Sequence, residues 1–113
     1  MVITIESSDL VDSARFHSAL ARAFGFPDFY GNNVSALVDC LGDLDNPSTE
    51  MTKIHLLPGQ TMVIRVTHLE DCDDRMDQIR PQLTQLNDAV AFVNLRRLDE
   101  KRPPLLALAY APA

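Results

Sequence analysis

Short apolar segments separated by helical patterns limit most strongly what this chain can fold into. The apolar segments lie at residues 2–6, 61–67 and 105–110. Strands linked through helices run parallel, because a crossover needs about a dozen or more residues whereas a hairpin needs only a turn. The middle segment is mostly apolar, which is typical of a strand buried on both faces. The sequence therefore predicts an α/β fold in which a small three-stranded parallel sheet is covered by helices.

A first helix is predicted over residues 11–24. Phe16 and Leu20 belong to a set of apolar residues that recur there at helical spacing. Polar residues 7–9 can cap the start of this helix, and Gly25 is a natural stop.

The second half of the chain is predicted to hold two more helical pieces. Asp73 or Asp74 can cap the first piece, and Pro81 is expected to kink or divide it. Residues 88–99 suit either a strand or a helix. A helix is favoured, because the parallel strand that follows needs a crossover. Residues 44–59 carry turn signals and are predicted to be a connection with one short helical turn.

Composition indicates a globular chain, with one domain expected over residues 1–113. The 113 residues are 46% hydrophobic and 23% charged, which excludes a disordered chain. No apolar run reaches the roughly 18 residues of a membrane span, and no signal peptide is visible, so we expect a cytoplasmic protein. A net charge of −6 disfavours nucleic acid as a ligand and suits a basic protein partner.

The cysteines and histidines form no known metal or redox motif. Cys40 and Cys72 are expected to be free thiols, with Cys40 beside the core. His17, His55 and His68 show no metal-ligand spacing, and His17 is predicted to lie on the surface of the first helix. A nucleophile–base pair of Cys40 and His68 is kept as a remote enzymatic alternative.

An acidic cluster follows the second predicted strand, at Asp71, Asp73, Asp74 and Asp77. Its spacing lacks the glycine and the final glutamate of an EF-hand loop. The cluster is interpreted as a solvated helix start, which can also help to steer a basic partner.

Residues 26–43, FPDFYGNNVSALVDCLGD, form an aromatic loop that leads into a short helix. Gly31 permits a backbone turn that a β-carbon would obstruct. Asn32 or Asn33 can cap the helix, which is predicted over residues 33–42.

The helix spacing separates a core face from an exposed face. Val34, Leu37 and Leu41 share the core stripe, whereas Ser35, Asp39 and Gly42 lie opposite, with Val38 at the border. Asp39 is thus expected to project into water from a rigid element. It is either an ordinary solvated charge or part of a recognition surface.

Phe29 and Tyr30 are two neighbouring aromatics of the loop. One is expected to pack down and anchor the loop. The other would then offer a flat contact to a partner.

The string PDFYGNNVSALVDCL resembles the barstar family. That family's pattern has Pro, an acidic residue, two aromatics, Gly, Asn and a closing Asp-Cys-Leu. The matching residues are Pro27, Asp28, Tyr30, Gly31, Asn33, Ala36, Leu37, Asp39, Cys40 and Leu41. The match is dense over about fifteen residues, and the order of the other elements agrees with the family along the whole chain.

The resemblance implies an intracellular inhibitor, without catalytic activity, cofactor or metal, that plugs the active site of a basic bacterial ribonuclease in a 1:1 complex. Asp39 would face the phosphate-binding cations of that enzyme. The implied partner-binding residues are Phe29, Tyr30, Gly31, Asn32, Asn33, Ser35, Val38, Asp39 and Gly42. The last helix would add a carboxylate, for which Asp99 and Glu100 are the candidates.

Three positions depart from the family. Ser35 stands where the pattern has an acidic residue, Val38 where the best-known member has a tryptophan, and Phe29 where a tyrosine is usual. These losses predict weaker binding to the usual enzyme. The alternative is a binding module of the same fold that neutralises a different, non-ribonuclease toxin or protein partner.

Overall fold

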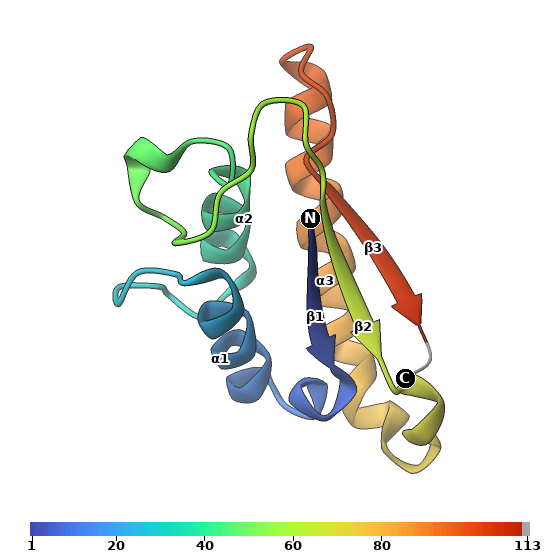
Figure 1. Ribbon diagram of the computed structural model, residues 1–113. Helices are drawn as coiled ribbons and strands as arrows, with labels where there is room; N and C mark the ends of the chain where they lie inside the picture. Colours follow the sequence, from blue (N-terminus) through green and yellow to red (C-terminus); the bar gives the residue numbers. More distant parts are fainter. Residues whose placement is uncertain (112–113) are drawn as a thin grey trace.

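The computed structural model describes residues 1–111 and contains one parallel sheet (Figure 1). Its strands are β1 (Val2–Glu6), β2 (Met62–Thr67) and β3 (Leu106–Ala111). The order is β1-β2-β3, and both neighbouring pairs are parallel. The predicted three-stranded parallel sheet is confirmed.

The two faces of the sheet differ in burial. Met62, Ile64 and Val66 are fully buried along β2, whereas Val63 and Arg65 between them are only half-buried. Successive side chains of a strand point to opposite faces. One face therefore carries the core, and the prediction that β2 is buried on both faces is wrong. The reason is that the helices pack against a single side.

Three helices surround this core. They are α1 (Ser13–Phe24), α2 (Val34–Gly42) and α3 (Met76–Asp99). Figure 1 shows α3 running along the sheet, with α1 and α2 on the side of β1. The helix α2 packs against α3. None of the helices in the described part is long and apolar enough to cross a membrane.

The start of α1 corrects one expectation. Residues 7–9 do not cap the helix but belong to a short 3₁₀ turn, η1 (Ser7–Leu10). The cap is Asp12, whose carboxylate accepts a hydrogen bond of 2.7 Å from the Arg15 amide. The predicted end at Gly25 is confirmed, with φ at +71°. A β-carbon there would also come within 2.6 Å of the Lys53 side chain.

The predicted division of the last helix is wrong. Helix α3 runs without a break through Pro81, and its residues after position 87 are helical, as favoured. Proline removes its own N–H bond to the preceding turn, and its ring crowds the carbonyl four residues earlier, so a helix that continues through it needs support from elsewhere. Ile79, Gln82 and Leu86 are all buried, so tertiary packing on both sides of Pro81 holds one helix.

The predicted cap of this helix is also wrong. Asp73 and Asp74 lie in a 3₁₀ turn, η4 (Asp73–Arg75), and no side chain caps α3. The connection 44–59 does contain the expected short turn, η2 (Pro47–Thr49).

Two side chains near the end of α3 fasten it to its surroundings. The amide oxygen of Asn94 accepts hydrogen bonds from the backbone amides of Leu105 and Leu106, at 3.0 and 3.1 Å. The buried guanidinium of Arg97 lies 2.9 Å from the carboxylate of Asp45. A buried charge of this kind requires a partner. The first contact ties α3 to the start of β3, and the second ties it to the segment that follows α2.

Candidate protein-binding surface on α2 and α3

Two neighbouring cavities lie between α2 and α3. The larger measures about 400 Å³ and is lined by Val38, Asp39, Gly42, Asp43, Met51, Val93, Arg96, Arg97, Glu100 and Arg102. The smaller measures about 280 Å³ and is lined by Val34, Ser35, Val38, Asp39, Phe92 and Arg96. Three residues border both: Val38, Asp39 and Arg96. We call the exposed residues Ser35, Asp39, Phe92 and Arg96 the α2–α3 face.

Helix spacing explains why these side chains meet. Ser35 and Asp39 are four residues apart on α2, and so are Phe92 and Arg96 on α3. Residues at this separation lie on the same side of a helix, one turn apart. Since α2 and α3 pack together, the two pairs border a common surface.

The position of Asp39 follows from how α2 is held. Asn33 caps the helix, because its side chain accepts a hydrogen bond of 2.8 Å from the Ala36 amide. Leu37 and Leu41 are completely buried on the opposite side, whereas Asp39 is exposed. The prediction that Asp39 projects into solvent from a rigid element is confirmed.

The local backbone differs slightly from expectation. The left-handed residue of the turn is Asn32, with φ at +54°, and not Gly31. Asparagine tolerates this conformation better than most residues. At Gly31 a β-carbon would still lie close to the Asn33 side chain, at 3.2 Å from its nitrogen.

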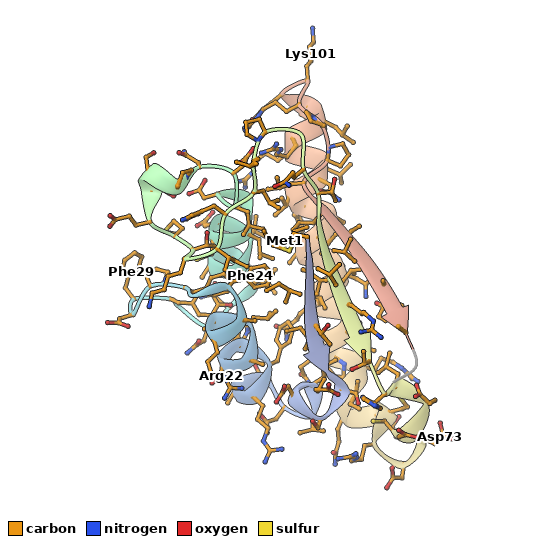
Figure 2. All side chains as sticks on the ribbon, in the orientation of Figure 1. Met1, Arg22, Phe24, Phe29, Asp73 and Lys101 are labelled. Carbon is orange, nitrogen blue, oxygen red and sulfur yellow. The ribbon has the colours of Figure 1, made fainter. Side chains whose placement is uncertain are left out.

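The two loop aromatics have separate roles. Tyr30 is half-buried, and its ring lies 4.7 Å from that of the buried Phe26. The Tyr30 hydroxyl forms a hydrogen bond of 2.6 Å with Nδ1 of His17. Phe29 is 77% exposed and lies at the outer edge of the loop in Figure 2. As expected, one aromatic anchors the loop and its neighbour is free for contact.

His17 is not the surface residue that the sequence predicts. It is 1% exposed, packed between the rings of Phe16 and Tyr30. Burial lowers its pKa from the ordinary 6.5, although a hydrogen bond with the Gln85 side chain opposes this. The loop that covers α1 buries this histidine. Helical spacing within α1 cannot predict contacts with that loop.

The thiols do not support the enzymatic alternative. Burial, together with the nearby charges of Asp39 and Asp43, raises the pKa of Cys40 to about 11, so this thiol is protonated at neutral pH. Nδ1 of His68 lies 2.7 Å from the Glu6 carboxylate, and no hydrogen bond within residues 1–111 joins the His68 ring to a thiol. Both cysteines are free, as predicted; Cys40 is buried, as expected, and Cys72 is buried too.

Both carboxylates and guanidinium groups line the larger cavity. Arg102 lies 3.3 Å from Asp45 and 3.2 Å from Glu100, and Arg97 is held by Asp45. Glu100 is thus the carboxylate of the last helical segment that reaches this surface, while Asp99 does not line either cavity. Asp39 and Arg96 enter none of the ion pairs found within residues 1–111.

The acidic cluster of residues 71–77 lies elsewhere. Asp71, Asp73 and Asp74 are exposed, and Figure 2 shows Asp73 at the end of the molecule opposite Lys101. No group of three or more potential metal ligands occurs in the described residues.

The structure divides the predicted contact residues into two sets. Ser35, Val38, Asp39 and Gly42 line the cavities, although Val38 is only 6% exposed and offers little area. The loop residues Phe29, Tyr30, Gly31, Asn32 and Asn33 line neither cavity. Among them, Tyr30 and Asn32 border a separate depression against α1.

Sequence reasoning missed Phe92 and Arg96. Phe92 is 60% exposed beside Ser35, and Arg96 borders both cavities. Their four-residue separation was the available signal. This separation places two side chains on one face only in a helix, and the sequence left open whether residues 88–99 form a helix or a strand.

Comparison with known proteins bears on this arrangement. No curated protein matches the chain significantly. A family model described as barstar (barnase inhibitor) matches residues 1–104, which is nearly the whole chain. The parallel sheet, the capped helix α2 and the exposed Asp39 agree with the resemblance in residues 27–41. The chain therefore belongs to the barstar family, whose members are non-enzymatic inhibitors of barnase-type ribonucleases.

Proposed function

We propose that this chain inhibits its ribonuclease by presenting Asp39 to the cationic groups that bind the substrate phosphate. The observation that carries this proposal is the position of Asp39. Its carboxylate is exposed, lies on a capped and well-packed helix and borders both cavities, and it enters no ion pair within residues 1–111.

A carboxylate can replace a phosphate in such a site. The Arg and Lys donors that hold a phosphate oxygen hold a carboxylate oxygen in the same way. Asp39 is fixed on a helix whose other side is buried, so little conformational freedom is lost when it binds. The net charge of −6 favours approach to a basic enzyme through long-range attraction.

Aromatic side chains would surround this central charge. Phe29 extends from the loop before α2, and Phe92 extends from α3 beside Ser35. Exposed aromatics of this kind are enriched at the centres of protein interfaces. Phe92 supplies the large apolar contact that Val38, which is nearly buried, does not.

We further propose a 1:1 complex and a cytoplasmic location. A single α2–α3 face per chain fits one enzyme molecule. Two free cysteines are typical of a reducing compartment.

Inhibition of purified barnase tests this proposal. The assay measures RNA cleavage at increasing concentrations of wild type, Asp39→Asn and Asp74→Asn. Asp39→Asn keeps the shape of the side chain and removes its charge, and we expect at least about 30-fold weaker inhibition, corresponding to about 2 kcal/mol. Asp74→Asn removes another exposed carboxylate, from the acidic cluster, and should change little.

The reverse result would relocate the interface. Full inhibition by Asp39→Asn together with a loss in Asp74→Asn would assign the contact to the acidic cluster. Circular dichroism of both variants verifies that they are folded.

The second candidate function is neutralisation of a different toxin by the same surface. The observation that favours it is the mixed charge of the α2–α3 face, where Arg96 stands beside Asp39 and Ser35 lacks the usual carboxylate. Failure of the wild-type protein to inhibit barnase, with tight binding to another basic toxin that depends on Asp39, would support this second function.

A further inference from the structure

Arg96 is the feature of the α2–α3 face that the proposed function leaves unused. It is exposed, and together with Asp39 it borders both cavities. The other two arginines of the larger cavity, Arg97 and Arg102, are engaged with Asp45 and Glu100. Within residues 1–111, Arg96 takes part in no such ion pair.

The neighbours of Arg96 show that it is presented in a defined position. It follows Phe92 by one turn of α3, and Val93 and Arg97 on the adjoining side of the helix are buried. The helix is thus held on one side while Arg96 extends from the other. Arginine loses little freedom for each hydrogen bond that it forms, and its planar group matches a carboxylate in two parallel hydrogen bonds.

An arginine beside Asp39 is unfavourable against a purely cationic surface. Two like charges brought together at an interface cost several kcal/mol, which is enough to exclude a wrong partner. The face therefore suits a partner that carries both signs: a cationic group opposite Asp39 and a carboxylate opposite Arg96.

The chemistry of RNA cleavage supplies such a combination. The attacking 2′-hydroxyl must lose a proton to a general base, for which a carboxylate is one of the usual groups. The phosphate is bound by cations next to that base. A ribonuclease with a carboxylate base therefore offers both charges within one active site.

We propose that Arg96 is a second recognition group, which pairs with a carboxylate beside the cationic site that receives Asp39. This inference rests on the proposed function. It names a property of the partner that follows from Arg96, a residue of α3 that lies outside the 27–41 resemblance.

A double-mutant cycle with barnase tests the inference. One side of the cycle compares wild type with Arg96→Ala. The other side replaces the acidic residues of the barnase active site by their amides, one at a time. Dissociation constants are measured with catalytically reduced enzyme. The matched control is Arg22→Ala, which removes an exposed arginine from α1, away from both cavities (Figure 2).

We expect Arg96→Ala to weaken binding about tenfold and Arg22→Ala to leave it within about twofold. The loss should disappear when one particular barnase carboxylate has been replaced, since the two substitutions remove the same pair. Arg96→Glu with that carboxylate replaced by lysine should recover binding.

Two results overturn the inference in distinguishable ways. Unchanged or tighter binding of Arg96→Ala, with Asp39→Asn still weakened, shows that Arg96 only opposes Asp39; the proposed function then stands alone. Barnase binding that is absent in the wild type, or insensitive to Asp39→Asn, removes the proposed function and this inference with it.

Discussion

Nδ1 of His17 lies 2.6 Å from the hydroxyl of Tyr30 and thereby fastens the loop before α2 to helix α1. The two rings are also in contact, with centroids 5.6 Å apart. Burial raises the pKa of Tyr30 well above its ordinary value, so its hydroxyl stays protonated. A hydrogen bond between the buried His17 and the half-buried Tyr30 stabilises the loop only while both partners are present.

Tyr30→Phe is expected to destabilise the protein by about 1–3 kcal/mol. The ring still packs, but the buried Nδ1 of His17 loses its partner and keeps the cost of desolvation. Urea unfolding measures the change. Phe29→Leu is the control, because Phe29 is largely exposed and its replacement should stay within about 0.5 kcal/mol. Equal effects of both substitutions would show that the hydrogen bond is unimportant.

His17 predicts a loss of stability in mild acid. Its pKa is lowered by burial, so the unfolded chain binds more protons than the folded one between the ordinary pKa of 6.5 and the lower pKa of the folded state. The contribution of neutral His17 to the free energy of unfolding is complete above pH 6.5. It is lost as the pH falls through the pKa of His17 in the folded state.

Urea unfolding between about pH 7.5 and about pH 5.5, values chosen to span about one unit on either side of the unperturbed histidine pKa, measures this slope. His17→Gln should flatten it, whereas His55→Gln, at an exposed histidine, should not. A slope that survives in His17→Gln would have to come from another group.

Phe92→Ala is expected to weaken partner binding by about 2 kcal/mol with little effect on folding. The ring borders the smaller cavity beside Ser35 and is mostly exposed, so its contacts form on binding. Leu98→Ala is the matched control, because Leu98 is also exposed but points to the other side of α3 by helical spacing. Titration calorimetry against barnase gives both values, and a larger loss for Leu98→Ala would contradict the assigned face.

Ser35→Asp is expected to tighten binding to barnase by about tenfold. It restores the acidic residue of the family pattern one turn before Asp39. Its effect on folding should be small, because two opposing terms nearly cancel. A carboxylate near the helix N-terminus is stabilising by about 0.3–1 kcal/mol, and repulsion between the carboxylates at positions 35 and 39 is destabilising by about 0.2–0.5 kcal/mol. Stopped-flow binding and thermal unfolding measure the two effects. Weaker binding would favour a partner other than a conventional barnase-type enzyme.

Both cysteines should resist a thiol reagent until the chain unfolds. Cys40 and Cys72 are buried, and the pKa of Cys40 is raised to about 11. Absorbance titration with a disulfide reagent at about pH 7, without added reductant, should detect two thiols in the denatured protein. The folded protein should react only slowly. Rapid labelling of Cys40 in the folded protein would contradict the assigned burial.

The sequence by itself determined the local features of this protein. Periodic apolar residues defined α1 and α2, and the long separations made the sheet parallel. The preference of asparagine for the cap position narrowed the cap of α2 to Asn32 or Asn33, of which the structure has Asn33. The exposure of Asp39 followed from helix geometry. Each of these depends on residues that are close along the chain.

Only the tertiary structure decided which distant residues meet. Pro81 remains within one helix because buried neighbours hold both sides, and His17 is buried because the loop folds over it. Phe92 and Arg96 join the candidate surface because α3 packs against α2. Propensity and spacing describe what each segment prefers, but burial depends on how segments pack. Residues 27–41 therefore contain only the α2 side of the candidate surface, and α3 supplies the other side.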